Sequence, residues 1–299
     1  MVQPLKEGDL IGIAAPSSPF DKQLFKQGVT LLQKMGFEVW YREDIFSQER
    51  YLAGSDKRRA QELTELFTKK EVKAILFARG GYGSQRVIPH LDPILLKKNK
   101  KPVVGFSDIT ALLTFLRQDC QTPTLYGPVL TQLGGSFVDR TCRSLKYNLT
   151  EKKSLEPFDL SECKIVEEGI AKGKLVGGCL SLITSSMGTP YELNTENSIL
   201  FFEDTGEKVY ALDRMLTQLK NAGKLKTVKG IIIGSLEPKE EEVHSIDTMI
   251  KDLLADFDGP IISHFPSGHT KDFVTLPFGV EVAIETETLK LYFEESAFT

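Results

Sequence analysis

A serine stands where a buried strand is expected to turn directly into a helix. Residues 101–110 read KPVVGFSDIT, in which two valines favour a strand and Gly105 permits a tight or positive-φ turn. Ser107 then opens the helix predicted over 109–118, where backbone N–H groups lack an intrahelical partner. It could be a nucleophile with the N–H of Asp108 as oxyanion donor, although the G-x-S-x-G motif of α/β-hydrolases is absent. From this stretch alone, an ordinary serine N-cap is the favoured interpretation.

A serine nucleophile needs a general base and a group that orients this base. Among the four histidines, His269 is the best candidate because it follows Ser267-Gly268 on a loop at the end of a strand. Glu203 is the best orienting acid, since an apolar strand leads into it, and Asp204 competes for that role. The other histidines are His90 in a helix-like segment, His244 in an acidic turn and His264 in a predicted strand. A metal site built from His244, His264, His269 and Glu240–Glu242 matches no zinc spacing, so no metal is predicted.

A glycine-rich turn, RGGYGS over 79–84, follows the strand predicted over 72–78. It lacks the Lys-Ser/Thr of a P-loop and the G-x-G-x-x-G spacing, so it does not indicate a nucleotide site. A flexible connection is the simple interpretation. The alternative is an oxyanion hole, because ligand sites in open α/β sheets collect at the carboxyl ends of the strands.

The first half of the chain alternates strands and helices. Apolar runs predict strands, and stretches with apolar residues every three or four positions predict helices. This order predicts a parallel sheet with helices on both faces. The predicted strands are 9–15, 37–41, 72–78, 101–107 and 122–129, and the predicted helices are 23–36, 56–69, 109–118 and 138–149.

The polar residues 151–162 lack helical or strand periodicity and are interpreted as a linker. We therefore expect one α/β domain over 1–150 and a second over 163–299. Short strands with turns, together with helices such as 180–187, predict a second α/β domain that is richer in β-structure.

Composition excludes several classes of protein. The chain has 299 residues and a net charge of −4, with no basic run, so neither nucleic acid nor a membrane is an expected partner. Four isolated cysteines indicate a reducing compartment, and the N-terminal apolar run is too short for a signal peptide or a membrane span. We expect a soluble cytoplasmic protein.

The motifs taken together resemble the LD-carboxypeptidase family, serine peptidases that include muramoyltetrapeptide carboxypeptidase and the microcin C immunity peptidases. The resemblance spans nearly the whole chain and rests on motifs in order: IGIAAPSSP, ARGGYGSQR, VVGFSDITALL, GPV, GKLVGGCLSLITSSMGTP, ILFFEDTGEKVYALDRML, GIIIGSL and FPSGHTKDFVTLPFG. One departure is Cys179, where many members are expected to have asparagine. That departure puts in doubt any polar contact made from this position.

The resemblance implies an N-terminal α/β sandwich, a C-terminal β-rich domain and a site at their junction. It assigns the family's catalytic triad to Ser107, Glu203 and His269, and the oxyanion donors to the backbone N–H groups of Gly81 and Asp108. It implies no cofactor, and a homodimer as the common assembly.

The expected activity is release of a terminal D-alanine from muropeptide tetrapeptides during wall recycling. The free carboxylate of such a substrate calls for an arginine. The candidates for substrate binding are Arg79, Tyr82, Arg86 and Arg214.

Two rival functions remain open. A microcin-C-type immunity peptidase would cleave an aminoacyl-nucleotide amide and would need an aromatic residue to stack on adenine. The region 130–190 and its edge offer Phe137, Tyr147, Phe158 and Tyr191, whereas the single tryptophan, Trp40, lies elsewhere. This leans towards the muropeptide. A non-catalytic ligand-binding α/β protein is the other rival, against which the complete triad argues.

Overall fold

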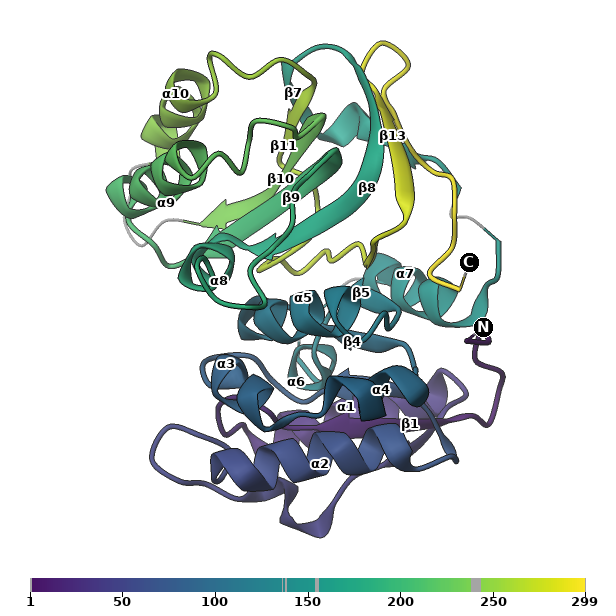
Figure 1. Ribbon diagram of the computed structural model, residues 1–299. Helices are drawn as coiled ribbons and strands as arrows, with labels where there is room; N and C mark the ends of the chain where they lie inside the picture. Colours follow the sequence, from purple (N-terminus) through teal and green to yellow (C-terminus); the bar gives the residue numbers. More distant parts are fainter. Residues whose placement is uncertain (1, 136, 138, 154–155, 238–242, 299) are drawn as a thin grey trace.

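Two β-sheets flanked by helices organise the chain, one in each half of the sequence (Figure 1). The computed structural model describes residues 2–135, 137, 139–153, 156–237 and 243–298, without the side chains of 243–245. Among the described residues, no helix combines the length and the apolar character that crossing a bilayer would require.

The first sheet has the strand order β12-β5-β4-β3-β1-β2. Its first five strands in the chain are all parallel, as the alternating pattern predicts, and β12 pairs antiparallel with β5. Because β3 and β4 are neighbours, the loops that follow them share one edge of the sheet. The strands are β1 (Leu10–Ala14), β2 (Glu38–Trp40), β3 (Val72–Phe77), β4 (Val103–Gly105), β5 (Thr124–Tyr126) and β12 (Leu276–Phe278).

Helices cover both faces of this sheet (Figure 1). The buried residues of α1 (Lys22–Lys34), α6 (Leu130–Leu133) and α7 (Asp139–Thr150) pack on one face. Those of α2 (Asp56–Thr68), α4 (Pro93–Lys98) and α5 (Thr110–Gln118) pack on the other. The short α3 (Ser84–Val87) follows the glycine-rich turn. The described residues of this half also include the 3₁₀ turns η1 (Glu43–Phe46), η2 (Ile88–His90) and η3 (Ser107–Ile109).

The second sheet has the order β6-β14-β13-β8-β9-β10-β11-β7, with a parallel centre from β8 to β11 and antiparallel pairs outside it. Its strands are β6 (Phe158–Asp159), β7 (Lys164–Glu167), β8 (Ile170–Cys179), β9 (Ser198–Thr205), β10 (Gly230–Glu237), β11 (Ile261–Ser263), β13 (Glu281–Glu285) and β14 (Lys290–Phe293). One face is covered by α8 (Leu180–Ser185), α9 (Val209–Asn221) and α10 (Val243–Leu253). The mixed α/β fold in two sheets agrees with the sequence prediction.

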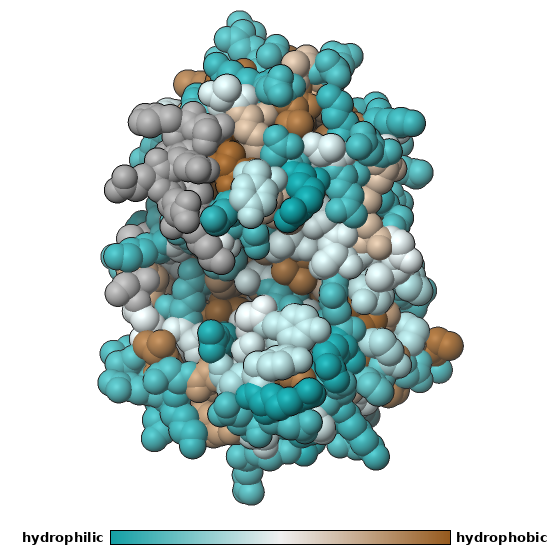
Figure 2. Space-filling view, turned by 90° about the vertical axis from the view of Figure 1, so that its left-hand side faces the viewer, coloured by the Kyte–Doolittle hydropathy of each residue, from teal (hydrophilic) through white to brown (hydrophobic). Residues whose placement is uncertain are grey.

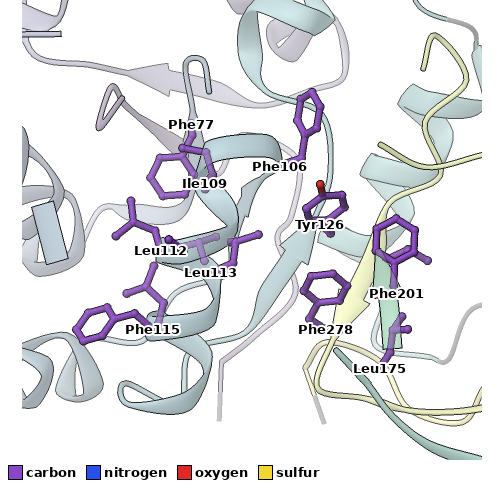
Figure 3. Close-up of a cluster of buried hydrophobic side chains, with 14 of the residues drawn as sticks. Phe77, Phe106, Ile109, Leu112, Leu113, Phe115, Tyr126, Leu175, Phe201 and Phe278 are labelled. Atoms are coloured by element: carbon purple, nitrogen blue, oxygen red, sulfur yellow. The ribbon is translucent and has the colours of Figure 1, made fainter. Parts of the chain in front are cut away.

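The C-terminal half contributes a strand to the first sheet, and the two halves share a core. β12 comes from the C-terminal half yet completes the first sheet, and β6 and η4 (Leu160–Glu162) lie within the predicted linker 151–162. The domain limits at 150 and 163 therefore stay predictions. Tyr126 and Phe278 of the first sheet contact Phe201 of the second in one continuous hydrophobic cluster (Figure 3). This shared core fixes how the ends of the strands from both sheets meet.

Candidate active site

The backbone at Ser107 is in the left-handed region, with φ of +62°. Such a conformation costs a non-glycine residue on the order of 1–3 kcal/mol, and residues that adopt it cluster at functional sites. The positive φ falls on the serine rather than on Gly105, the position at which the sequence allowed one. Gly105 is needed for space, because a Cβ there would lie 2.8 Å from both Phe77 and Ile109.

Ser107 does not cap a helix with its side chain, so the N-cap interpretation was wrong. It is the first residue of η3, whose N-cap is Phe106, and that cap position makes no side-chain capping bond. The Oγ of Ser107 instead lies 3.2 Å from Nε2 of His269. The two residues are 162 positions apart in the sequence, so only the tertiary structure could show this contact.

Glu203 orients His269 through two hydrogen bonds to the same carboxylate oxygen. Nδ1 of His269 lies 2.7 Å from Oε2 of Glu203, and the backbone N–H of His269 donates to that oxygen at 3.0 Å. Gly268, with φ of +109°, leaves the space for this contact, since a Cβ there would lie 2.4 Å from Oε2. The geometry therefore brings the three predicted residues into the order acid, base, hydroxyl.

The neighbouring carboxylates Glu203 and Asp204 point to opposite faces of β9, as successive residues of a strand must. Oδ2 of Asp204 accepts a hydrogen bond from the N–H of Ser181, at the start of α8, and lies 3.5 Å from Sγ of Cys179. Burial raises the pKa of Asp204 above its ordinary value. Asp204 thus supports α8, and it acts on His269 only through its negative charge, without a hydrogen bond to the imidazole.

The electrostatic environment of His269 favours its protonated form. Burial lowers the pKa of the imidazole, but the hydrogen bond and the negative charge of Glu203 outweigh burial, so that the pKa of His269 is raised above its ordinary value. A base of this kind can take a proton from Ser107 and hold the resulting positive charge beside a carboxylate.

The glycine-rich turn lies directly against the serine. A Cβ on Gly80 would be 3.1 Å from Cβ of Ser107, and Gly81 adopts a φ of +99°. The N–H of Tyr82 donates to Oγ of Ser18 at 3.1 Å, so the loop after β1 supports the turn from behind. Asp108 follows the serine within η3, at the position where an N–H has no intrahelical partner.

The Asp108 side chain ties the surrounding loops together. Its buried carboxylate oxygen Oδ2 accepts hydrogen bonds from Oγ of Ser17 at 2.5 Å and from the N–H of Ser84 at 2.8 Å. The buried Arg59 guanidinium donates to the carbonyl oxygens of Gly83, at 2.7 Å, and Pro16. Charged groups inside the first half thus hold the turn in place.

Tyr126, at the end of β5, is a part of the site that sequence reasoning missed. Its hydroxyl donates to Oε1 of Glu203 at 2.5 Å, and the N–H of Ser107 approaches that hydroxyl at 3.4 Å. The available signal was its place at the carboxyl end of the strand next to the one that leads to Ser107.

The predicted substrate-binding residues lie apart from one another. Arg79 is exposed and donates to the carbonyl of Pro19 at 2.6 Å, whereas Arg86 is paired with both carboxylate oxygens of Asp56. Tyr82 is 48% exposed, and its ring lies 5.7 Å from that of Tyr51, a second aromatic residue that the sequence did not single out. On α9, exposed Arg214 lies over the Tyr210 ring. Figure 2 shows a face that is hollowed where the two halves meet.

Two of the remaining histidines, His90 and His264, are not part of this arrangement. His90 ends η2, and exposed His264 follows β11 instead of lying inside it as predicted, with φ of +59°. Glu240–Glu242 and the side chain of His244 lie outside the described residues.

Two family models and several known proteins match this chain. The family model described as LD-carboxypeptidase N-terminal domain matches residues 11–127, and the one described as LD-carboxypeptidase C-terminal domain matches 172–284. The chain is 36% identical over 288 residues to the probable murein peptide carboxypeptidase of Bacillus subtilis, covering 94% of this chain and 90% of that protein.

Two solved structures are similar to this chain over nearly its whole length. The microcin C7 self-immunity protein MccF, an inactive mutant in its apo state, is 27% identical with a TM-score of 0.93, covering 100% of this chain and 99% of that one. The muramoyltetrapeptide carboxypeptidase of Oxalobacter formigenes is 27% identical with a TM-score of 0.83, covering 95% and 97%.

Proposed function

This chain belongs to the LD-carboxypeptidase family and is a serine-type carboxypeptidase, and from that premise we propose that it hydrolyses the L,D amide bond of muropeptide tetrapeptides and releases the terminal D-alanine. The observation that carries the proposal is the hydrogen-bonded series Glu203–His269–Ser107. Family membership also removes the non-catalytic rival.

In the first step Oγ of Ser107 attacks the carbonyl carbon of the L,D amide, and Nε2 of His269 takes the hydroxyl proton. Glu203 fixes the tautomer of His269 and stabilises the imidazolium. The C–N bond then breaks, His269 gives its proton to the leaving nitrogen, and D-alanine departs. The remainder of the peptide stays on Ser107 as an ester.

In the second step His269 takes a proton from water, and the hydroxide attacks the ester carbonyl. The C–O bond to Ser107 breaks and His269 returns the proton to Oγ. The oxyanion of both tetrahedral intermediates rests on the N–H groups of Gly81 and Asp108, each donor contributing about 3–4 kcal/mol in comparable sites.

Arginines near the site would recognise the free carboxylate of the substrate. Arg79 and Arg214 are the stronger candidates, because the Arg86 guanidinium already pairs with Asp56. Reversing the charge of the responsible residue should raise KM for substrates with a free carboxylate, and unchanged kinetics for Arg79→Glu, Arg86→Glu and Arg214→Glu would remove this part of the proposal.

We further propose that the protein acts in the cytoplasm as a homodimer. Its substrate would be muropeptides returned from the cell wall, which a cytoplasmic enzyme would meet during recycling. Fractionation and sedimentation velocity test these two statements.

A microcin-C-type immunity peptidase is the second candidate, because the MccF structure has a TM-score of 0.93, against 0.83 for the muramoyltetrapeptide carboxypeptidase. Of the aromatic candidates for stacking on adenine, Phe158 is otherwise engaged because it packs on Phe265. The single tryptophan, Trp40, lies outside the candidate region, and its ring contacts Lys69. This favours the muropeptide.

The deciding experiment incubates the protein with a muramoyl tetrapeptide and, separately, with an aminoacyl sulfamoyl adenosine. D-alanine release from the first, absent in Ser107→Ala, is the expected result. Exposed Ser161→Ala serves as the matched control and should turn over like wild type. Cleavage of the second compound alone would select the rival function, and full turnover by Ser107→Ala would exclude Ser107 as the nucleophile.

A further inference from the structure

Tyr126 joins the two halves of the catalytic arrangement through one buried hydroxyl. We propose that Tyr126 is a positioning residue that holds Glu203 as an oriented carboxylate and thereby sets the proton affinity of the Glu203–His269 pair. This inference rests on the proposed function for its meaning, since it concerns the base of that reaction.

The first observation is how the oxygens of Glu203 are shared. Oε2 receives both hydrogen bonds from His269, through Nδ1 and through the backbone N–H. Oε1 receives the Tyr126 hydroxyl at 2.5 Å, its one hydrogen bond from a described residue. Among the described residues, no lysine or arginine pairs with Glu203. The tyrosine is thus the second hydrogen-bonding partner of a buried charge.

The other titratable groups that act on the pair are Asp204 and Glu237, whose negative charges raise the pKa of His269, and the buried thiol of Cys179. All three remain in place when the Tyr126 hydroxyl is removed, so a shift in that variant reports the hydroxyl.

The second observation is that neither side chain has access to water. Glu203 and Tyr126 are both 0% exposed. A buried carboxylate oxygen that lacks a hydrogen-bond donor destabilises the folded protein, and the cost is larger when the group is charged. Burial and the charge of Glu203 raise the pKa of Tyr126 well above its usual range, so the hydroxyl keeps its proton and remains a donor.

The third observation is that the ring has little freedom to move. Phenylalanine rings from both halves surround it, with centroids 5.3 to 6.2 Å away: Phe106, Phe201, Phe273 and Phe278. Figure 3 shows the Tyr126 ring between Phe106 and the pair Phe201 and Phe278. This packing fixes the hydroxyl beside Glu203, and a Tyr126→Phe substitution would keep the ring in place.

The same hydroxyl lies near the nucleophile. The N–H of Ser107, whose backbone is in the left-handed region, approaches it at 3.4 Å. One oxygen therefore lies between the strained backbone of the serine and the acid that orients the base, although these come from different sheets.

Removing the Tyr126 hydroxyl should raise the apparent pKa of the Glu203–His269 pair. The Tyr126 hydrogen bond stabilises the carboxylate, so its loss makes the Glu203–His269 pair bind a proton more tightly. The apparent pKa of the pair then rises, and activity that needs neutral His269 is lost at a higher pH. A residue that only fills space would not cause this shift.

The test follows the imidazole directly, without requiring turnover. Histidine-¹⁵N-labelled protein contains four histidines, and His269→Gln assigns the relevant signal. We expect the apparent pKa of His269 to be higher in Tyr126→Phe by about 0.5 unit or more, since one unit corresponds to 1.36 kcal/mol. Tyr292→Phe, on β14, is the matched control and should leave it unchanged.

Kinetics on the muramoyl tetrapeptide give the second readout. In Tyr126→Phe we expect kcat to fall about tenfold, KM to stay near wild type and the acid limb of kcat/KM to move to higher pH. An unchanged or lower His269 pKa in folded Tyr126→Phe overturns the inference. If wild type releases no D-alanine but the pKa still rises, the proposed function fails and the coupling of Tyr126 to the pair stands.

Discussion

The two loops that meet at the site are held in different ways. The turn over 79–83 and η3 are fixed by groups of their own half, namely the Asp108 carboxylate and the Arg59 guanidinium. The loop over 264–275, which carries His269, is fixed largely by the other half. Its contacts include Phe273 N–H to Oγ1 of Thr141 and Thr275 N–H to Oγ of Ser144, both on α7, each at 2.9 Å.

A catalytic residue can therefore belong to one half of the sequence and be held in place by the other half. His269 belongs to the C-terminal half by sequence, yet α7 anchors its loop and β12, which follows, enters the first sheet. Only Glu203 is supplied by the second sheet itself, from β9. The base is therefore placed by both halves at once, whereas the nucleophile is placed by one.

The largest loss of kcat in this comparison should come from replacing Glu203. Glu203→Gln keeps the size of the side chain but removes the charge that orients His269 and stabilises its protonated form, and loss of the corresponding carboxylate in a serine protease costs about 10⁴-fold in kcat. We expect a loss of about 10³–10⁴-fold here. Asp204→Asn, one residue along β9, is the matched control and should stay within about tenfold of wild type. Similar losses in both variants would contradict the separation of their roles.

Asp108→Ala tests how the loops around Ser107 are held in place. It leaves Oγ of Ser17 and the N–H of Ser84 without their buried acceptor, which should destabilise the fold by about 1–3 kcal/mol. Because the turn carrying Gly81 is also released, we expect kcat to fall about 10–100-fold.

Asp92→Ala controls for instability alone. Asp92 caps α4 in the same half, and its removal should cost about 1 kcal/mol without lowering kcat. Equal kcat values for Asp108→Ala and Asp92→Ala at a temperature where both are folded would show that Asp108 acts on stability only.

The pH dependence of kcat/KM in the wild type reports the protonation of His269. Glu203 raises the pKa of His269 above its ordinary value, and the base must be neutral to accept the serine proton. Activity should therefore be lost as the pH falls through this raised pKa, with kcat/KM decreasing about tenfold per pH unit below it. In Glu203→Gln the acid limb should move to lower pH. An acid limb in the wild type below the ordinary histidine range would count against the pairing.

The smallest effect should come from Arg140, which links α7 to the base loop through an ion pair with Asp272. The guanidinium is more than a third exposed, so Arg140→Ala should change stability by less than about 1 kcal/mol. We expect a loss in kcat of about threefold from the looser loop, within the limits of exposed pairs.

Lys290→Ala, which removes an exposed pair with Asp159, is the control for charge and should have no effect on kcat. If Arg140→Ala leaves kcat unchanged as well, the loop over 264–275 is held by its other contacts to the first half.

The alternating strands and helices of the first half could be read from the sequence, because apolar periodicity and capping residues act locally. The start of α1 illustrates this, since the Asp21 carboxylate accepts hydrogen bonds from the N–H groups of Gln23 and Leu24. β12 could not be assigned in this way. Its three residues continue directly toward β13, and only the tertiary structure pairs them with β5.

The candidate residues could likewise be predicted from the sequence, but their contacts could not. Serine, histidine and carboxylate could be chosen by chemistry, and the order of the motifs indicated the family. Which of Glu203 and Asp204 orients the base depends on which face of β9 lies beside His269. The role of Tyr126 depends on the packing of the two sheets, which brings its hydroxyl to Glu203. The sequence by itself determined the chemical groups and the helices and strands that bear them. The tertiary structure alone decided which groups touch, because contacts across 77 and 162 positions arise from packing and leave no local pattern.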